Sequence, residues 1–525
     1  MKNVVYLPVR ILTVFIVFYL LLPNLLFQTF WFRMELAVPM VTGLVVSFYF
    51  YLNNEISGET RIVYFSYIQI FFLIIFAFFL TVISGVGGFS YQTNDFVGHN
   101  SKFFDLSNNP WPIYFDGADT FGCYYWGYYL VPSVIGKLTG GVSETAIFLW
   151  TYTGVLAGIT MAFIVLKNNM GRLVLLFAIG GIGHTIKVIF GIVAGVGFTH
   201  PIVFIEVWNL LNQLMWAPNQ LIPILMIASL VYYKGVVNRD ITTCLFPLTL
   251  ILIWSVFPTI TLSLTSLLIF IFFGFFKNLK KINLTIFITS VAVPVFCSLP
   301  VLNYFLASAG IPIRGFIWTF QPLSPILMDY SICVFLDILA LWFVWKHLIV
   351  NRCEVPDLYF YGLLGIILIF ALYRFGFAND WLVRGTMPVF MILFFAILRG
   401  NLSFSEQGRS AANRGLKFAF TGLMLLCLAG PFSYLYRASQ NNVIRNAIAG
   451  QQLFHAYPYN KYKNIFEAIK EHHGDPEAAQ YLGNKQSNYW ISLSNRRKDV
   501  GEIIAGMRIE AFKNQQTQKY LYRYL

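Results

Sequence analysis

The chain has 525 residues, of which 58% are hydrophobic and only 11% are charged. Its mean hydropathy of +0.66 lies outside the range of ordinary soluble globular proteins. The net charge of +13 suits basic loops beside anionic lipid, so nucleic acid is not the expected partner. The six cysteines are scattered, mostly within apolar segments, and suggest neither a disulfide framework nor a metal site.

Apolar stretches of about 18 to 25 residues recur along the chain, each long enough to cross the hydrocarbon core of a bilayer as a helix. We therefore expect an all-α polytopic membrane protein with about 13 transmembrane helices. The first stretch begins near Leu7 and is long enough to be an anchor rather than a cleaved signal. The expected spans are residues 8–31, 36–53, 62–85, 143–166, 173–196, 213–233, 241–256, 258–276, 282–302, 329–349, 357–373, 382–399 and 416–434.

Short basic loops set the expected orientation of these spans. With this set of spans, every basic loop falls on the same side as Met1, and the positive-inside rule places that side in the cytoplasm. We therefore expect a protein of the cytoplasmic (inner) membrane with a cytoplasmic N-terminus and an extracytoplasmic C-terminus. The basic loops are residues 167–172, 234–239, 277–281, 346–352 and 399–417.

This topology divides the chain into three parts. Residues 1–61 are expected to form two N-terminal membrane helices, residues 62–436 a transmembrane core, and residues 437–525 a small extracytoplasmic region. The core contains a large outer loop at 86–142 with juxtamembrane helices. Residues 121–138 of that loop are expected to form an aromatic-rich helix in the membrane interface, because counting them as a span would reverse every later loop.

The ionisable residues outside the basic loops collect on the expected outer face. A helix over 95–105 would place Asp95, His99 and Lys102 on one face, although the same spacing is typical of a solvated juxtamembrane helix. Asp116 and Asp119 lie in a glycine-containing turn, which favours a role as turn formers. The outer loop carries Asp95, His99, Lys102, Asp105, Asp116 and Asp119.

Later outer segments add acids, arginines and amides to this face. Acids that face arginines suit a substrate with a phosphate leaving group, because guanidinium groups bind phosphate oxygens in bidentate fashion. A carboxylate could then accept a proton from the acceptor or bind a divalent metal. Interfacial anchoring would also explain Glu206, Arg374 and Arg384. The later residues of this set are Glu206, Trp216, Gln220, Arg314, Arg374, Asp380 and Arg384.

Three ionisable residues, His184, Lys187 and Asp337, lie within expected spans. Such residues are candidates for function, but paired structural contacts explain them equally well. His472 and His473 are expected to be ordinary exposed residues, because two adjacent histidines do not make a metal site.

Several motifs occur in the order typical of a family of membrane enzymes. Over residues 62–235, with a looser match at 379–384, the chain resembles the GT-C superfamily of membrane glycosyltransferases. This superfamily includes oligosaccharyltransferase catalytic subunits, protein O-mannosyltransferases and lipid A aminoarabinose transferases. The motifs are Asn94-Asp95-Phe96 at the start of the outer loop, Trp111-Pro112-Ile113-Tyr114, YYWGYY at 124–129, Gly136-Lys137-Leu138 and GVSE at 141–144.

The resemblance implies a glycosyltransferase of the cell envelope. It would move a sugar or an oligosaccharide from a polyprenyl-(di)phosphate donor to a protein, glycolipid or envelope-polymer acceptor on the extracytoplasmic face. Asp95 matches the position of the family's catalytic aspartate, and Glu206 is the nearest match to its second acid. These two acids would also hold the divalent metal, Mg²⁺ or Mn²⁺, that the resemblance suggests.

The remaining candidate residues follow from the chemistry of the outer face. Donor phosphate binding is expected of Arg374, Arg384, His99 and Lys102, and contacts with donor or acceptor are expected of Trp216, Gln220, Asp380 and Arg314. The chain departs from the family where Phe96 replaces the acid that usually follows the catalytic aspartate. It also has no WWD-type acceptor motif and no large C-terminal domain.

Two alternatives belong to other functional classes. A transporter or flippase of lipid-linked glycans would need polar residues through the membrane midplane and two related halves. The spans hold few such residues, and charges collected at one face favour an enzyme. A non-catalytic scaffold of an envelope assembly would also fit a one-sided set of charges.

Overall fold

The computed structural model describes residues 4–57, 61–193, 205–310, 313–349, 354–376, 379–400 and 411–495. Within these ranges the chain is predominantly helical, and its short strands pair into the ribbons β1–β2, β3–β4 and β5–β6. The expected all-α class is confirmed. Residues 496–525 of the expected C-terminal region, and residues 350–353 and 401–410 in the basic loops, lie outside the described residues.

The helices and strands follow one another with short 3₁₀ or π turns between some of them. The first half holds β1 (Val4–Pro8), α1 (Val9–Trp31), α2 (Met34–Ser57), β2 (Ile62–Ser66), α3 (Tyr67–Ile83), α4 (Phe96–Asn108), β3 (Tyr114–Phe115), β4 (Thr120–Phe121), α5 (Gly127–Thr139), α6 (Glu144–Val165), α7 (Met170–Ala178), α8 (Ile182–Val193), α9 (Leu210–Trp216) and α10 (Pro218–Val231). The second half holds α11 (Leu245–Thr249), α12 (Val256–Phe272), α13 (Phe275–Lys281), α14 (Leu284–Phe287), α15 (Val293–Leu306), β5 (Arg314–Phe316), α16 (Leu323–Tyr330), α17 (Leu336–Phe343), α18 (Asp357–Phe370), β6 (Tyr373–Phe375), α19 (Asp380–Val383), α20 (Met387–Arg399), α21 (Ala411–Gln440), α22 (Val443–Ala449), α23 (Ile465–His473) and α24 (Asp475–Ala478).

Seven of the described helical segments are long and apolar enough to cross a membrane, or eight if the bent pair α12–α13 is one span. A helical membrane protein is therefore supported, with fewer continuous spans than the about 13 expected from apolar length. The seven segments are Val9–Trp31, Met34–Ile56, Glu144–Val165, Pro218–Val237, Leu284–Leu306, Leu323–Leu348 and Asp380–Arg399.

Breaks in the helices account for much of this difference. The expected span 173–196 is divided into α7 and α8, because Gly180 and Gly181 adopt positive φ between them. The expected span 241–256 contains only the short α11 and turns. At Gly274, which also has positive φ, the chain bends by 104° from α12 into α13. Two further apolar helices, α3 and α18, have fewer than 18 residues.

Close packing of α6 on α10 fixes the centre of the bundle. A Cβ added at Gly154 of α6 would lie 2.7 Å from Ile222, and one added at Gly158 would lie 2.9 Å from Leu225. This small-xxx-small spacing lets two helix backbones approach closely, as is common between membrane helices. The contact holds α10 in the middle of the bundle, with its first residues at one end.

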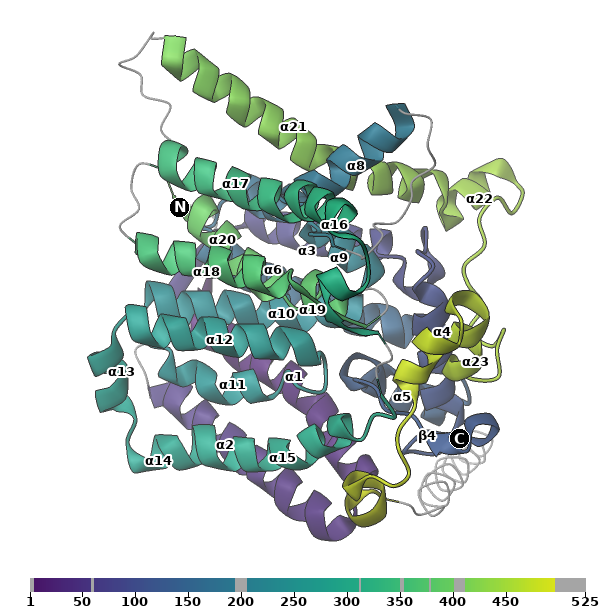
Figure 1. The fold of residues 1–525 in the computed structure, drawn as a ribbon. Coiled ribbons are helices and arrows are strands. Elements are labelled where there is room, and N and C mark those ends of the chain that lie inside the picture. The colour runs from purple at the N-terminus through teal and green to yellow at the C-terminus, as the bar shows by residue number, and fades with distance from the viewer. Residues whose placement is uncertain are drawn as a thin grey trace, which may run out of the picture.

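The long helices run side by side, so the loops gather at two ends of the molecule. In Figure 1 the chain begins near the left-hand end, where α13 also lies, and α4, α5 and α23 lie at the right-hand end. Ion pairs join several loops that were expected on the cytoplasmic side. Lys167 and Arg399 both contact Glu354, at 3.3 and 2.6 Å, and Lys234 contacts Glu55 at 2.7 Å. Loops that were expected on one side of the membrane are therefore grouped in space.

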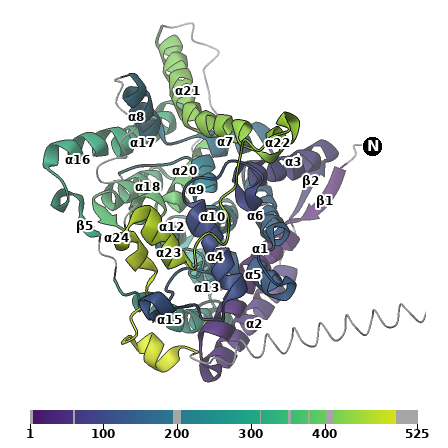
Figure 2. The same ribbon diagram turned by 90° about the vertical axis from the view of Figure 1, so that its right-hand side faces the viewer.

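At the other end, the described part of the C-terminal region covers the outer loop. Figure 2 shows this end, with α23 and α24 lying close to α4. The backbone N–H of Ile465 donates a 2.8 Å hydrogen bond to Asp105, and the N–H of Cys123 donates to the carbonyl of Tyr481. Ile465 and Ile469 are buried. The described C-terminal residues are thus part of the same packed structure as α4.

Candidate functional site

A cavity of about 740 Å³ lies where the outer loop, the start of α10, α19 and the C-terminal helices meet. Its charged and polar lining comes from these elements, whereas α12, α15 and α18 contribute apolar side chains. The polar lining includes Asp95, His99, Lys102, Asn219, Gln220, Asp380, Arg384, His473, Glu477 and Gln480. The apolar lining includes Val256, Phe257, Ile260, Leu302, Phe305, Leu306, Ile369 and Phe370.

Arg384 joins two of the acids that line the cavity. Its Nη2 lies 3.3 Å from Oδ2 of Asp95, and its Nε lies 3.6 Å from Oδ1 of Asp380. Nη1 donates a 3.1 Å hydrogen bond to Gln213, and the guanidinium lies over the ring of Trp208. A buried guanidinium is stable only when it is paired, so these contacts explain how Arg384 is tolerated beneath the surface.

The ribbon β5–β6 brings this arginine to the outer loop. Tyr373 and Phe375 of β6 line the cavity, and the chain then turns at Asn379, which has a left-handed φ of 49°. The short α19 follows directly, so that Asp380 and Arg384 are four residues apart and contact each other.

His99 lies in the cavity wall but has no ring nitrogen free for a ligand. Its Nδ1 is 2.6 Å from the hydroxyl of Tyr129, and its Nε2 is 3.0 Å from the carbonyl oxygen of Trp216. A carbonyl only accepts, so Nε2 carries the proton and Nδ1 accepts from the tyrosine. Burial lowers the pKa of His99 to about 3, which keeps the ring neutral. This geometry favours a positioning role over the expected binding of phosphate.

Lys102 is held by aromatic rings instead of by acids. Its Nζ lies 4.1 Å from the ring centre of Tyr124, 5.2 Å from that of Tyr481 and 5.4 Å from that of Tyr129. Only 3% of the residue is exposed. Burial lowers the pKa of Lys102 to about 7, although Asp95, Glu477 and Asp380 partly offset this effect. The cavity thus contains an ammonium group that lies against aromatic rings and has three acids in its surroundings.

The C-terminal helices supply residues that the sequence did not indicate. Oε2 of Glu477 is buried and lies 3.4 Å from Nδ1 of His473, and it makes no hydrogen bond among the described residues. Burial, with Asp95 and Asp380 nearby, raises the pKa of Glu477 to about 8. The prediction that His473 is an ordinary exposed residue is wrong, because α23 folds over α4. The apolar spacing of Ile465 and Ile469 was the available signal for this packing.

The start of α10 also faces the cavity. Asn219 is 1% exposed, and neither atom of its side-chain amide has a hydrogen-bond partner among the described residues. The helix begins at Pro218 with no side chain capping its first amides. Partial positive charge collects at such a terminus, which makes it suitable for an anion. An unpaired buried amide at the same place indicates a polar ligand.

Trp216 and Gln220 line the cavity as expected and are held by other side chains. The indole N–H of Trp216 donates to the hydroxyl of Tyr434 at 3.0 Å. Gln220 donates to the hydroxyl of Tyr125 at 2.7 Å and accepts from Ser255 at 2.9 Å. These bonds fix both side chains before any ligand binds.

Glu206 lies outside this cavity. Its carboxylate accepts from Trp208 and lies 3.0 Å from Nδ1 of His184. Burial would raise the pKa of Glu206, but these contacts outweigh it and leave the pKa lowered. The ring of Trp208 lies between Glu206 and Arg384. Asp95 and Glu206 thus contact different partners, and the described residues contain no cluster of three or more His, Cys, Asp or Glu side chains suited to a metal.

Two of the predicted arginines do not line the cavity. Arg374 alternates along β6 with the lining residues Tyr373 and Phe375, and its guanidinium lies over the ring of Phe320. Arg314 is exposed on β5. Of the expected phosphate-binding arginines, the structure brings only Arg384 to Asp95.

The other acids of the outer loop have structural partners. Asp105 binds the backbone of Ile465, as described above. Asp119 ends the expected turn with a left-handed φ of 49° and pairs with Lys485 at 2.7 Å. Asp116 is exposed in the same turn. The prediction that Asp116 and Asp119 are turn formers is confirmed.

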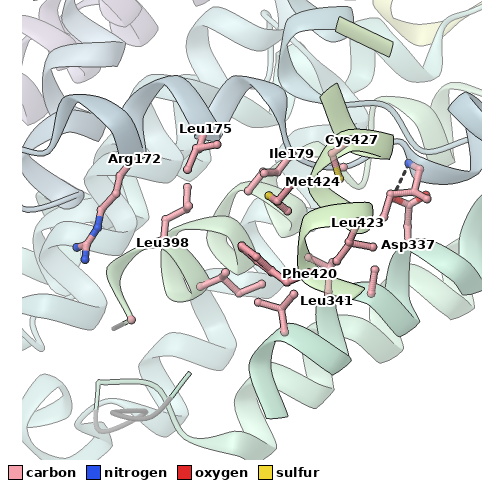
Figure 3. Close-up of a pocket in the computed structure, with 16 residues that line it drawn as sticks. Arg172, Leu175, Ile179, Asp337, Leu341, Leu398, Phe420, Leu423, Met424 and Cys427 are labelled. Atoms are coloured by element: carbon pink, nitrogen blue, oxygen red, sulfur yellow. Dashed lines mark hydrogen bonds between the residues drawn. The ribbon is translucent and has the colours of Figure 1, made fainter. Parts of the chain in front are cut away.

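Asp337 lines a second cavity, which has a volume of about 390 Å³ (Figure 3). Its lining from α7, α17, α20 and α21 is mostly apolar. At one end, Asp337 accepts hydrogen bonds from the backbone N–H groups of Ile182 and Gly183, at 3.0 and 3.1 Å, and thereby caps α8. Lys187 pairs with Asp329 in the same region. The ionisable residues within the expected spans thus form structural pairs.

No protein-family model matches the chain, and no curated protein and no solved structure is significantly similar to it.

Proposed function

We propose that this protein is an integral membrane glycosyltransferase that uses a polyprenyl-phosphate-linked sugar donor. One observation carries the proposal: a single cavity combines a wall of charged groups with an apolar wall that reaches the outside of the bundle. Leu306 and Ile369 line the cavity and are also 76% and 66% exposed. A ligand with a charged head and a long apolar tail fits such a site, since its tail can extend between α12, α15 and α18 into lipid.

Three features of the charged wall suit a phosphate. Arg384 supplies a guanidinium, Lys102 an ammonium with no ion-pair partner among the described residues, and α10 a helix start without a side-chain cap. Charge-assisted hydrogen bonds from such groups are among the strongest that a protein offers to phosphate oxygens.

Asp95 is the group best placed to act as a base. Its side chain is one-third exposed, and it borders the cavity beside Arg384. Burial raises the pKa of Asp95 although Arg384 opposes this, so the carboxylate is a stronger base than one in water. In the proposed step, the acceptor hydroxyl gives its proton to Asp95 and its oxygen bonds to the anomeric carbon. The bond from that carbon to the phosphate oxygen breaks, and its electron pair leaves with the phosphate held by Arg384 and Lys102.

We also infer the placement of the protein in the membrane. The grouped basic loops favour a cytoplasmic position for the end that holds β1 and α13. The cavity would then open on the extracytoplasmic face of the inner membrane, where a protein, glycolipid or envelope polymer can serve as acceptor. On this view the short and broken helices complete a GT-C-like core of about 13 membrane segments.

Complementation of a deletion strain tests the proposal. The strain would carry the wild-type protein, Asp95→Asn or, as a matched control, Asp116→Asn, which changes an exposed acid of the same loop. We expect mass spectrometry to show normal envelope glycoconjugates with the wild type and the control and a loss of at least about 10²-fold with Asp95→Asn. Full restoration by a normally expressed Asp95→Asn protein would contradict the proposal.

The same cells distinguish the enzyme from a transporter. If the protein is a transferase, unused lipid-linked sugar accumulates in the outer leaflet of the deletion strain. Accumulation in the cytoplasmic leaflet would instead show that translocation is the step that is lost.

A further inference from the structure

The cavity has more polar groups than a donor phosphate would use. Glu477 and Gln480 border it from the C-terminal side, and Asn219 borders it from the start of α10. Oε2 of Glu477, Nε2 of Gln480 and both side-chain amide atoms of Asn219 are buried without hydrogen-bond partners among the described residues. Buried polar atoms are nearly always paired in folded proteins, so a group of unpaired ones around one cavity indicates a ligand with several hydrogen-bonding groups.

These atoms lie close to the reacting carboxylate and its partners. A Cβ at Gly376 would be 3.1 Å from Oε1 of Gln480 and 3.5 Å from Oδ2 of Asp380, so the amide and this acid share one small volume. Asp380 in turn contacts Arg384, the partner of Asp95. Gln480 therefore lies next to Asp380, which contacts the arginine partner of Asp95.

The chemistry of the group suits hydroxyls. Amides donate and accept hydrogen bonds, and a carboxyl group that is protonated near neutral pH does the same. Burial gives Glu477 a pKa of about 8, so it can act as such a group. The aromatic side chains of Tyr124 and Tyr481 line the same cavity. Several donor–acceptor groups beside aromatic side chains suit a sugar ring, which presents many hydroxyls and apolar C–H groups.

We propose that Asn219, Glu477 and Gln480 form a subsite that binds a sugar of the acceptor, so that the acceptor is a glycan and not a peptide. This inference rests on the proposed glycosyltransferase function and specifies its second substrate. It also gives the described C-terminal segment a role, since α24 and the residues after it would present the acceptor to Asp95.

Binding experiments with the full chain in lipid nanodiscs test this subsite separately from the donor site. Trp216 and Trp381 line the cavity, so intrinsic fluorescence can report on both ligands. Farnesyl phosphate is the probe for the donor site, and a panel of methyl glycosides is the probe for the acceptor subsite. Blocked tripeptides that contain Asn or Ser serve as the competing class of acceptor.

The wild-type protein is expected to bind farnesyl phosphate and at least one glycoside. The double variant Glu477→Ala/Gln480→Ala should weaken glycoside binding by at least about tenfold, because it removes two hydrogen-bonding groups. At pH 7, where Glu477 is mostly neutral, it should change farnesyl phosphate binding by less than about threefold. Glu477→Gln, which keeps a donor and an acceptor, should retain most of the glycoside binding. Glu471→Gln, an exposed acid of α23 outside the cavity, is the matched control.

The outcomes separate the two proposals. Three results would overturn the acceptor subsite alone, provided that the wild-type protein binds farnesyl phosphate. They are no binding of any glycoside, equal glycoside binding by the wild type and the double variant, and binding of tripeptides in place of glycosides. A wild-type protein that does not bind farnesyl phosphate would contradict the donor site, and with it the proposed function.

Discussion

Asp95 and Arg384 lie 289 residues apart in the chain, and their side chains meet at 3.3 Å in the wall of a cavity. The contact joins the first residue before α4 to the last turn before α20. It therefore joins the outer loop to a late outer segment. It also places a carboxylate and a guanidinium side by side in the wall of the cavity that a charged substrate would occupy.

Replacement of Arg384 is expected to weaken the binding of a prenyl phosphate. Arg384→Gln removes the guanidinium, and the loss of a charge-assisted contact should reduce farnesyl phosphate affinity by at least about tenfold. Intrinsic fluorescence of the protein in nanodiscs measures this affinity. Arg314→Gln, which changes an exposed arginine outside the cavity, should have no effect. Equal losses in the two variants would show that general surface charge attracts the ligand.

Lys102 is expected to make this binding depend on pH. Burial lowers the pKa of its ammonium to about 7, so its charge is lost as the pH rises above that value. Between about pH 7 and 9, above the second ionisation of the phosphate, farnesyl phosphate binding should weaken by up to about tenfold per pH unit. A flat profile for the wild-type protein would contradict a role for the Lys102 charge.

Ionisation of Glu477 should also weaken farnesyl phosphate binding as the pH rises. Its pKa of about 8 means that a negative charge appears in the cavity over the same range and repels the phosphate. Lys102→Arg, which stays charged, should therefore remove part of the pH dependence, and Lys102→Arg/Glu477→Gln should remove nearly all of it. Titrations of the two variants from pH 7 to 9 separate the contributions.

Glu206 is expected to matter less than Asp95. Trp208 lies between Glu206 and the cavity, and a glutamine at position 206 can still accept the hydrogen bond from its indole. Glu206→Gln should keep more than about one-tenth of the glycoconjugate level in the complementation assay, whereas Asp95→Asn should not. Loss of activity as severe as that of Asp95→Asn, in a protein of normal abundance and thermal stability, would indicate direct contact of Glu206 with substrate or metal.

Packing of α6 on α10 predicts a difference between two glycine substitutions. Gly158→Ala would place a Cβ 2.9 Å from Leu225, and overpacking of this kind costs about 1–3 kcal/mol. Gly362 of α18 has open space around it, so Gly362→Ala should be neutral or slightly stabilising. Thermal unfolding in detergent should show a lower midpoint for Gly158→Ala only. An unchanged midpoint would mean that α6 and α10 pack less closely.

The grouping of the loops could be predicted from the sequence. The lengths of the apolar stretches indicate which segments lie in the bilayer, and the basic residues indicate which loops lie on the same side of it. The shared face of Asp95, His99 and Lys102 could be predicted too, since it follows from helical spacing within α4. Helix continuity was harder to predict: the paired positive φ angles at Gly180 and Gly181 break a stretch whose composition is uniformly apolar.

The remaining parts of the site depend on contacts between distant segments. Glu477 and His473 reach the cavity because α23 packs on α4, and few residues in the intervening chain indicate that packing. Arg374 points away from the cavity because its segment is a strand with alternating sides, whereas a helix end was expected. Glu206 was expected beside Asp95, but it contacts His184 and Trp208 and does not line the cavity.

Photocrosslinking with a prenyl phosphate tests the charged and apolar walls together. The protein in nanodiscs would be labelled with farnesyl phosphate that carries a photoreactive diazirine at the tail end, and the labelled peptides would be identified by mass spectrometry. We expect label on the cavity-facing residues Ile260 of α12, Leu302 of α15 and Ile369 of α18, competition by unlabelled polyprenyl phosphate, and a strong reduction in Arg384→Gln. Label spread over the outer surfaces of other helices, such as α3, with neither competition nor dependence on Arg384, would contradict a lipid-linked substrate in this cavity.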